Sequence, residues 1–463
     1  MIRIFSHYIP IRTLFLLSLE SLVLICSIYL GLAFTNLTPE TTLPVVPLPV
    51  GFIVAVLAVF LLSSMTAMGL YDSGLHEALG ITLLRLLIAF VLGLVLASIA
   101  ISIFPSLSLG ANALFTTFTV ALIGSAATRL VFVGWITPKA FQRRVLVLGT
   151  GSRAASVEEL VRDKKNHIRI VGYLSTAPAT SHVETARILP QQESLIEAVK
   201  RHRVDEIVIA VRDRRGGAIP VQELLDCRLR GILITDLASF FERERCQLHL
   251  ESLNMSWIIF NEGFRQGFVR ETVKRLFDVA ASALLVLATL PVMLVTALAI
   301  YLEDGKPILY RQERVGQGGN VFTIFKFRSM RTDAERDGRP QWAGANDDRT
   351  TRVGKIIRKL RIDELPQILN VLRGDMSFVG PRPERPFFVD QLASKIPYYN
   401  ARHSIKPGIT GWAQVRYPYG ASLDDAVEKL QYDLYYVKNH TLFLDVMVLI
   451  DTVQVVLWGK GAR

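Results

Sequence analysis

Four long apolar runs occupy the first 140 residues of the chain. They lie at residues 14–34, 50–70, 83–103 and 113–133. Each run has about 20 residues, which is the length that a helix needs to cross the hydrocarbon core of a bilayer. The pattern predicts a bundle of four transmembrane helices within residues 1–140.

Basic residues flank this bundle, whereas two of its loops contain none. Arg3 and Arg12 precede the first run and three basic residues follow the fourth, but the loops around Glu40 and Pro105 have no lysine or arginine. Loops rich in lysine and arginine stay in the cytoplasm. We therefore expect both ends of the bundle on the cytoplasmic side.

From Arg144 onward the pattern changes to that of an α/β domain. Four short apolar runs alternate with polar helical stretches. The runs lie at residues 145–148, 168–173, 207–211 and 231–235. Alternation of this kind predicts a parallel sheet, and we expect a Rossmann-like domain over residues 141–264.

The first strand of this domain leads into a glycine turn. Gly149, Gly151 and Ala154 have the spacing of the dinucleotide-binding fingerprint, but the acidic residue expected about 20 residues later is missing after Tyr173. No Tyr-x-x-x-Lys pair occurs in the domain either. The sequence favours a fold kept for packing or oligomerisation. A nucleotide-sugar-modifying enzyme that works through this domain is the alternative.

A second long apolar stretch lies within residues 276–302 and contains Pro291. Basic residues lie on both sides of it, among them Lys274 and Lys306. A single crossing would put one basic side outside the cytoplasm, against the charge rule. A helix that breaks at Leu290 and Pro291 and returns to the cytoplasmic face satisfies both sides. A kinked ordinary span is the alternative.

Two adjacent carboxylates, Asp363 and Glu364, precede an apolar helical pattern that Gly374 ends. Pro366 falls in the first turn, where its missing N–H costs nothing. The carboxylates are expected at the helix N-terminus, whose partial positive charge favours ionised side chains and nearby phosphate groups. Alternatively, Asp363 is a simple helix cap and Glu364 a first-turn acid without a catalytic role.

A basic strand-like run precedes the acidic pair. Alternation along residues 321–331 puts Lys326 and Arg328 on one face, where their side chains suit phosphate oxygens. A solvated charged face is the alternative. Between this run and Asp363 lies a loop rich in glycine and charge, at residues 332–352.

Composition fits membrane segments joined to soluble domains. Hydrophobic residues make up 51% of the chain and charged residues 20%. The formal net charge of +11 suits anionic lipid headgroups, phosphorylated substrates or nucleic acid, and does not choose between them. The three cysteines, Cys26, Cys227 and Cys246, have no metal-ligand spacing, so neither a disulfide framework nor a zinc site is indicated.

Five motifs after residue 270 together resemble the monotopic phosphoglycosyltransferase superfamily, the bacterial sugar transferases that initiate exopolysaccharide or O-antigen synthesis. The motifs are Arg275-Leu-Phe-Asp278, Lys326-Phe-Arg-Ser-Met330, Asp363-Glu-Leu-Pro-Gln367, Gly380-Pro-Arg-Pro383 and Pro407-Gly-Ile-Thr-Gly-Trp412. The whole chain is similar to the large members of that family, including those of exosortase-associated systems. The resemblance implies a re-entrant helix and a small α+β catalytic domain over residues 265–463.

The resemblance also implies an activity. Such a protein would transfer a sugar 1-phosphate from a UDP-sugar to undecaprenyl phosphate and release UMP, at the cytoplasmic face of the bacterial inner membrane. UDP-glucose and UDP-galactose are the first expectations for the donor. The implied partners include the lipid bilayer and exclude nucleic acid, and a homodimer stays open.

Site residues follow from the same resemblance. Asp363 would form a covalent phosphosugar adduct, and Glu364 would help bind Mg²⁺ and assist catalysis, with Asp363 as a second metal ligand. The phosphate- and nucleotide-binding residues would be Lys326, Arg328, Pro381, Arg382 and Pro383.

The chain departs from the family at two places. Leu290 precedes Pro291 where relatives often have serine, and Arg416-Tyr-Pro-Tyr-Gly420 replaces the Asn-Gly-Arg type of sequence. A membrane scaffold or regulator of polysaccharide assembly, without catalytic activity, is the non-enzymatic alternative.

Overall fold

The computed structural model describes most of the chain in segments. These are residues 2–4, 7–36, 49–71, 79–105, 111–135, 142–163, 168–175, 182–184, 187–190, 194–211, 219–253, 263–264, 267–331, 349–417, 420 and 422–458. Glu40, Lys139, residues 332–348 and residues 418–419 lie outside them. The chain forms two compact units, one made of Met1–Ser125 and Ser256–Arg463 and the other of Ala126–Met255.

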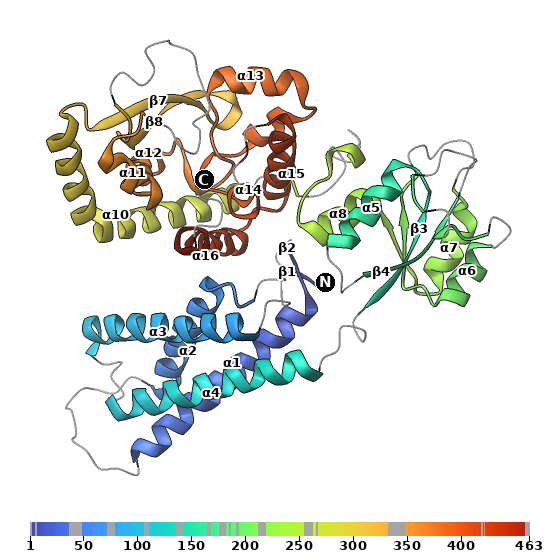
Figure 1. The fold of residues 1–463 in the computed structure, drawn as a ribbon, viewed down its shortest axis with the longest axis horizontal. Coiled ribbons are helices and arrows are strands. Elements are labelled where there is room, and N and C mark those ends of the chain that lie inside the picture. The colour runs from blue at the N-terminus through green and yellow to red at the C-terminus, as the bar shows by residue number, and fades with distance from the viewer. Residues whose placement is uncertain are drawn as a thin grey trace. The chain divides into compact units, whose positions relative to one another are not determined.

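The four apolar runs near the N-terminus are helical, as expected (Figure 1). They form α1 (Ile11–Asn36), α2 (Val50–Ala67), α3 (Leu79–Ile103) and α4 (Ala111–Trp135). By length and composition, α1, α3 and α4 can cross a membrane, and α2 is a shorter apolar helix. Leu84, Leu87 and Val91 of α3 are exposed, as lipid-facing side chains are. Before α1, β1 (Ile2–Ile4) pairs with β2 (His7–Ile9) in an antiparallel hairpin.

The second unit contains the predicted parallel sheet. Its strands are β3 (Arg143–Leu148), β4 (Ile168–Leu174), β5 (Glu206–Ile209) and β6 (Leu233–Asp236), in the order β4-β3-β5-β6. The helices are α5 (Ser152–Asp163), α6 (Leu195–His202), α7 (Val221–Leu229) and α8 (Leu237–Arg245), followed by a 3-10 turn, η4 (Leu250–Ser252). This alternation confirms the α/β class predicted for this part of the chain.

Side chains of β3 alternate between two cores. Val145 and Val147 pack with residues of α5 and α8, whereas Leu146 and Leu148 pack with residues of α6 and α7. Successive side chains of a strand point to opposite faces of the sheet. The sheet is therefore covered by two helices on each face, which explains why its first strand reads as continuously apolar.

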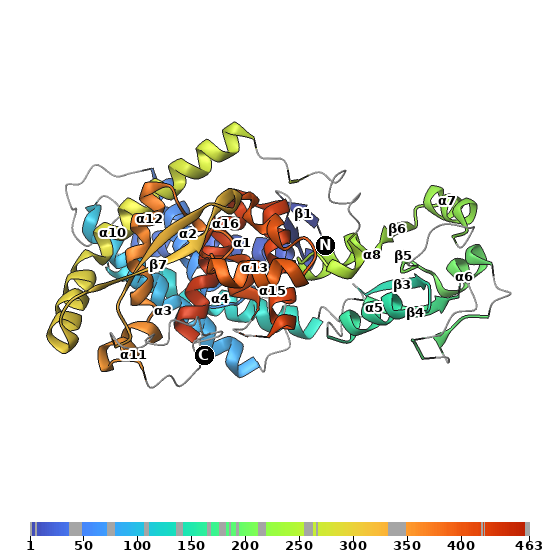
Figure 2. The same ribbon diagram turned by 90° about the horizontal axis from the view of Figure 1, so that it is seen from above.

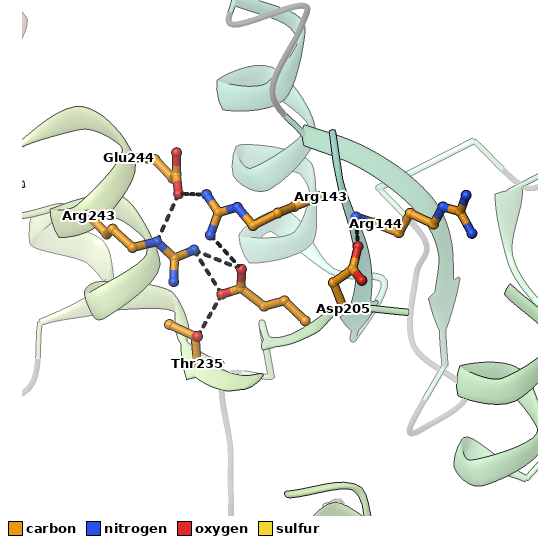
Figure 3. Close-up of polar contacts among 7 residues, drawn as sticks. Arg143, Arg144, Asp205, Thr235, Arg243 and Glu244 are labelled. Carbon is orange, nitrogen blue, oxygen red and sulfur yellow. Dashed lines mark hydrogen bonds and ion pairs between the residues drawn. The ribbon is translucent and has the colours of Figure 1, made fainter. Parts of the chain in front are cut away.

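A buried group of ion pairs joins three strands of this sheet to α8 (Figure 3). Glu206, which is fully buried, accepts hydrogen bonds from Arg143 (3.1 Å), Arg243 (2.8 and 2.9 Å) and the hydroxyl of Thr235 (2.6 Å). Both arginines also bond to Glu244. Two cations and two anions thus compensate one another inside the unit.

The second apolar stretch forms one long helix, α10 (Phe268–Asp304), which is also long and apolar enough to cross a membrane. The helix continues through Leu290 and Pro291, so the expected break there is wrong. Figures 1 and 2 show instead that the ribbon of α10 changes direction along its length. Proline removes a backbone donor and clashes with the preceding turn, and it is an established cause of helix bending.

Both ends of α10 are fixed to the same small fold. Near its start, Asp278 accepts hydrogen bonds from the Ser377 hydroxyl (3.0 Å) and the Phe378 backbone N–H (3.1 Å). At its end, Glu303 accepts hydrogen bonds from the first two backbone N–H groups of the next helix, α11 (Arg352–Lys359), at 2.7 and 2.9 Å. A straight helix of 37 residues would be about 56 Å long. Its two ends nevertheless attach to one compact fold.

This small fold is a mixed arrangement of short strands and helices, shown in yellow to red in Figure 1. Its strands are β7 (Leu309–Val315), antiparallel to β8 (Val321–Phe327), and β9 (Ser377–Val379), parallel to β10 (Gly408–Thr410). Its α-helices are α11 (Arg352–Lys359), α12 (Ile368–Arg373), α13 (Pro386–Lys395), α14 (Trp412–Arg416), α15 (Leu423–Asn439) and α16 (Leu442–Trp458). Its 3-10 turns are η5 (Gln317–Gly319), η6 (Ile362–Gln367) and η7 (Tyr399–Ser404).

Asn370 connects α12 to β8. Its side chain is fully buried, accepts a hydrogen bond from the Phe325 N–H (3.1 Å) and donates one to the Thr323 carbonyl (2.7 Å). The amide thus bonds to the backbone of β8 as a neighbouring strand would. This contact fixes η6, which leads directly into α12, beside the strand that carries Lys326.

Replacing Glu206 by leucine is expected to lower the free energy of unfolding by about 3 kcal/mol, because Arg143 and Arg243 lose a buried carboxylate. Thermal unfolding of the purified protein, followed by circular dichroism, measures this. The matched control is Asp205→Asn, since the exposed side chain of Asp205 accepts the Arg144 N–H (2.8 Å) and an amide oxygen can replace it. Equal effects of the two substitutions would contradict the prediction.

Candidate active site

Asp363 and Glu364 lie in the first turn of η6, which continues into α12. This confirms that the acidic pair lies at the N-terminal end of a helix. The alternative in which Asp363 caps that helix is wrong. Arg361 occupies the cap position with left-handed backbone angles (φ 59°), and no side chain caps the turn. The Asp363 carboxylate is therefore directed elsewhere.

Glu364 is held by two cations. Its Oε1 accepts hydrogen bonds from Lys326 Nζ (2.9 Å) and Arg382 Nη2 (2.7 Å), and the residue is 8% exposed. Burial alone would raise the pKa of Glu364, but the charges of Arg382 and Lys326 lower it well below its usual range. Glu364 is therefore an ionised, fixed carboxylate.

Asp363 is in the opposite situation. Its Oδ1 is buried and has no hydrogen-bond partner among the described residues. Burial, followed by the negative charge of Glu364, raises the pKa of Asp363 to about 6, against the opposing effect of Lys326. Native proteins rarely leave a buried oxygen unpaired, and such atoms often mark a site for a ligand or an ion. The two neighbouring carboxylates thus lie in different electrostatic environments, and their pKa values shift in opposite directions.

Arg382 is positioned by its flanking prolines and by a buried arginine. The carbonyl of Pro381 accepts from Gly408 N–H (3.0 Å), and that of Pro383 accepts from Arg314 (3.0 Å). Arg402 donates to the carbonyl of Arg382 itself (2.9 Å). Proline has no backbone N–H to offer to a phosphate, so Pro381 and Pro383 act here by fixing the backbone.

Sequence reasoning missed Arg402 and its partner Asp433. Arg402 lies 2.8 Å from Asp433 and donates to the Tyr399 hydroxyl (2.8 Å). Burial raises the pKa of Asp433 to about 6, although Arg402 opposes the shift. A signal was present in α15, because Asp433 occupies a core position between Leu430 and Leu434. An acid at such a position needs a buried cationic partner.

Lys326 and Arg328 line the same cavity but bind different groups. Lys326 reaches Glu364, whereas Nη2 of Arg328 donates to the carbonyls of Asp304 (2.7 Å) and Gly305 (3.0 Å) at the end of α10. Phe327 between them lines the cavity too, and Arg328 lies beyond the end of β8, so their placement on one strand face stays a prediction. Their binding of phosphate stays a prediction.

A cavity of about 820 Å³ contains both carboxylates. Eleven arginine and lysine side chains line it, against four aspartates and glutamates. An excess of positive charge in a concave site attracts anionic ligands, and arginine forms paired hydrogen bonds with phosphate. The cavity therefore suits a phosphorylated ligand, with the unpaired oxygen of Asp363 available for it.

Comparison with known families agrees with this site. Residues 269–459 match the bacterial sugar transferase family, and residues 66–219 match a CoA-binding domain. The first match includes the acidic pair, Lys326 and Arg382. The second includes α3, α4 and most of the parallel sheet.

Curated relatives cover different parts of the chain. The UDP-N-acetylgalactosamine-undecaprenyl-phosphate N-acetylgalactosaminephosphotransferase of Aeromonas hydrophila is 50% identical over 191 residues, which are 41% of this chain and 45% of that protein. The undecaprenyl-phosphate glucose phosphotransferase of Komagataeibacter xylinus is 32% identical, over 69% of this chain and 60% of that protein. The UDP-glucose:undecaprenyl-phosphate glucose-1-phosphate transferase of Xanthomonas campestris pv. campestris is 32% identical, over 74% of each. The chain thus spans less than two thirds of the first two relatives.

The raised pKa of Asp363 predicts a pH-dependent effect on stability. A carboxyl whose folded-state pKa of about 6 exceeds its ordinary value binds its proton more tightly in the folded protein. The folded state therefore loses stability as the pH rises from about 4 to about 6. Asp363→Asn is expected to raise the free energy of unfolding by roughly 2–3 kcal/mol at about pH 8, and by about half as much at about pH 5.

Thermal unfolding at both pH values measures this difference. The control is Asp390→Asn, which removes an exposed carboxylate of α13 and is expected to change stability little at either pH. A stabilisation by Asp363→Asn that is equal at the two pH values would contradict the prediction.

Proposed function

The chain belongs to the bacterial sugar transferase family, and on this premise we propose that it transfers a sugar 1-phosphate from a UDP-sugar to undecaprenyl phosphate. UMP is the second product. The observation that carries the proposal is the pairing of a fixed, ionised Glu364 with an unpaired oxygen of Asp363 in a basic cavity. Such a site suits covalent catalysis on a phosphorylated substrate.

In the first step, the Asp363 carboxylate attacks the phosphorus that carries the sugar. A bond forms between Asp363 and this phosphorus, and the bond to the bridging oxygen breaks, so that UMP leaves with the electron pair. Arg382 and Lys326 stabilise negative charge that develops on the phosphate oxygens. In the second step, an oxygen of the lipid phosphate attacks the same phosphorus. The bond to Asp363 breaks and restores the carboxylate.

The two carboxylates take different roles in this scheme. Glu364 already accepts hydrogen bonds from Lys326 and Arg382, which lowers its nucleophilicity and holds both cations toward the cavity. Asp363 has an oxygen without a partner among the described residues. Asp363 is therefore the nucleophile, and Glu364 positions the phosphate-binding cations.

Mg²⁺ fits this donor set as a partner of the substrate. Within the described part of the chain, no group of three or more histidine, cysteine, aspartate or glutamate side chains could hold a metal by itself. Mg²⁺ is often held by one or two carboxylates together with substrate phosphates. Asp363, with Glu364 beside it, would hold the ion with the diphosphate. When bound, Mg²⁺ neutralises charge on phosphate oxygens.

We also propose that α10 enters the membrane and returns to the cytoplasmic face. Its exposed apolar side chains, such as Leu284, Leu287 and Leu298, suit a lipid environment. Its two ends attach to one fold through Asp278 and Glu303. A helix that crossed the bilayer once would place these attachments on opposite sides. The site then lies at the cytoplasmic face of the bacterial inner membrane, where exopolysaccharide synthesis would begin.

Release of UMP from a panel of UDP-sugars tests the activity. The panel includes UDP-glucose, UDP-galactose and UDP-N-acetylgalactosamine, because the named relatives act on different sugars. Purified membranes are expected to release UMP with one or more donors when Mg²⁺ and undecaprenyl phosphate are present. Asp363→Asn is expected to lower the rate by at least about 10³-fold.

The same experiment separates the alternatives. A phosphosugar adduct trapped on Asp363 excludes a scaffold without catalytic activity. Full activity of Asp363→Asn overturns the assignment of the nucleophile. The exposed Asp390→Asn variant, with wild-type rates, controls for the loss of a carboxylate.

Cysteine labelling tests the path of α10. The native Cys26, Cys227 and Cys246 are first replaced by serine. Thr272→Cys and Lys306→Cys then place one exposed thiol near each end of the helix. A membrane-impermeant maleimide is expected to label both variants in inside-out vesicles and neither in right-side-out vesicles. Labelling of the two from opposite sides would show a single crossing.

A further inference from the structure

The lining of the cavity differs from one side of Asp363 to the other. Residues from the end of β8 and from α11 contribute several arginines and no carboxylate to the lining. Residues from α15 and the segment before α13 contribute Asp433 and Glu384. Leu285 of α10 and Pro307, which follows this helix, also line the cavity. Arg328, which follows β8, binds the end of α10, so the side that adds no carboxylate to the lining is the side next to the proposed membrane helix.

Arg328 anchors this side and has hydrogen-bonding capacity left over. It is 6% exposed, and its Nη2 binds the carbonyls of Asp304 and Gly305 and lies 3.1 Å from the Asp304 carboxylate. Its Nε and Nη1 are buried and have no partner in the described part of the chain. Leaving such donors unpaired costs free energy, and a bound anion would remove this cost.

Arg331 and Arg358 extend the positive charge toward α11. Arg358 makes one long hydrogen bond, to the hydroxyl of Thr350 (3.4 Å), and Arg331 is exposed. Neither pairs with a carboxylate among the described residues. Unlike Lys326 and Arg382, these arginines are not bound to Glu364.

We propose that Arg328, Arg331 and Arg358 bind the phosphate monoester of the lipid acceptor, apart from the cations that face the UDP-sugar. This inference rests on the proposed function. A phosphate monoester carries nearly two negative charges at neutral pH, so it favours a site with several cations. Of these three arginines, only Arg328 pairs with a carboxylate among the described residues, that of Asp304. The apolar Leu285 and Pro307 allow the attached lipid to leave the cavity toward α10.

The arrangement accounts for the second chemical step. A phosphate oxygen of the bound lipid attacks the phosphorus on Asp363 and forms the new P–O–P bond. The bond between Asp363 and phosphorus breaks, and its electron pair returns to the carboxylate. No proton transfer is required, because the attacking oxygen is already ionised.

Kinetics of the two half-reactions test the proposal with the full-length protein. In a two-step mechanism, kcat/KM for each substrate reports its own half-reaction. Arg358→Gln is expected to lower kcat/KM for undecaprenyl phosphate by about tenfold or more, a loss typical of one charged contact. The exchange of labelled UMP into the UDP-sugar needs no lipid. With the donor that is active in the UMP-release screen, the exchange rate of Arg358→Gln is expected to stay within about twofold of the wild-type rate.

Arg331→Gln is the second test variant, because loss of an exposed side chain leaves no buried gap. The matched control is Arg311→Gln on β7, which removes an exposed arginine that lies over Phe325 and outside the cavity lining. The control is expected to match wild type in both half-reactions.

Three outcomes decide the matter. A selective loss of the lipid half-reaction in both test variants supports the acceptor site. An equal loss in the exchange reaction, or unchanged kinetics with the lipid, overturns it while the proposed function stands. A wild-type protein that neither exchanges UMP nor transfers sugar phosphate overturns the proposed function itself.

Discussion

The position of Glu364 between Lys326 and Arg382 is the interaction on which the candidate site depends. These three residues come from η6, from β8 and from the segment after β9, which are distant in the sequence. Removing charges from water costs free energy, and apolar side chains in their place are often at least as stable. The triad of Glu364, Lys326 and Arg382 is therefore better explained by its placing of two cations in the cavity than by a contribution to the stability of the fold. It also leaves Asp363, the neighbouring acid, without an ion pair of its own among the described residues.

Buried hydrogen bonds from an amide and from a charge-compensated arginine fix the backbone segments that carry this triad. Asn370 bonds to the backbone of β8, and Arg402, compensated by Asp433, bonds to the carbonyl of Arg382. Each contact fixes a main-chain segment and leaves the nearby cavity-facing side chain available. A rigid surrounding structure of this kind can hold a group in an unfavourable state. The buried, unpaired oxygen of Asp363 is such a group, and its raised pKa is a consequence.

Local sequence patterns predicted much of the fold, because the type of an element depends largely on the spacing of apolar residues within it. The apolar runs of α1 to α4 and the alternation of strands and helices in the second unit need only periodicity, and both are found in the structure. The motif residues Lys326, Asp363 and Arg382 were also predicted to meet, although only the resemblance brought them together. Partners that are distant in sequence were not predictable. Nothing in the sequence pairs Arg402 with Asp433, and nothing shows that Glu364, unlike Asp363, receives both cations.

Two details of the backbone were also not predicted from the sequence. The cap position of η6 belongs to Arg361, which adopts a left-handed conformation that non-glycine residues rarely show. Proline within α10 suggested a break, yet the helix stays continuous because an α-helix can bend around the missing hydrogen bond. In both cases the backbone adopts a conformation that the local sequence disfavours, and residue preferences alone do not show where this happens.

The attachments of α10 connect the membrane to the site. The start of α10 is bound through Asp278 to β9, the strand that leads to Arg382. Its end is bound through Arg328, which follows β8, the strand that carries Lys326. The two segments that hold the cations around Glu364 therefore also hold the helix proposed to enter the bilayer. A lipid phosphate that approaches along α10 would then meet Asp363 at a distance set by the fold.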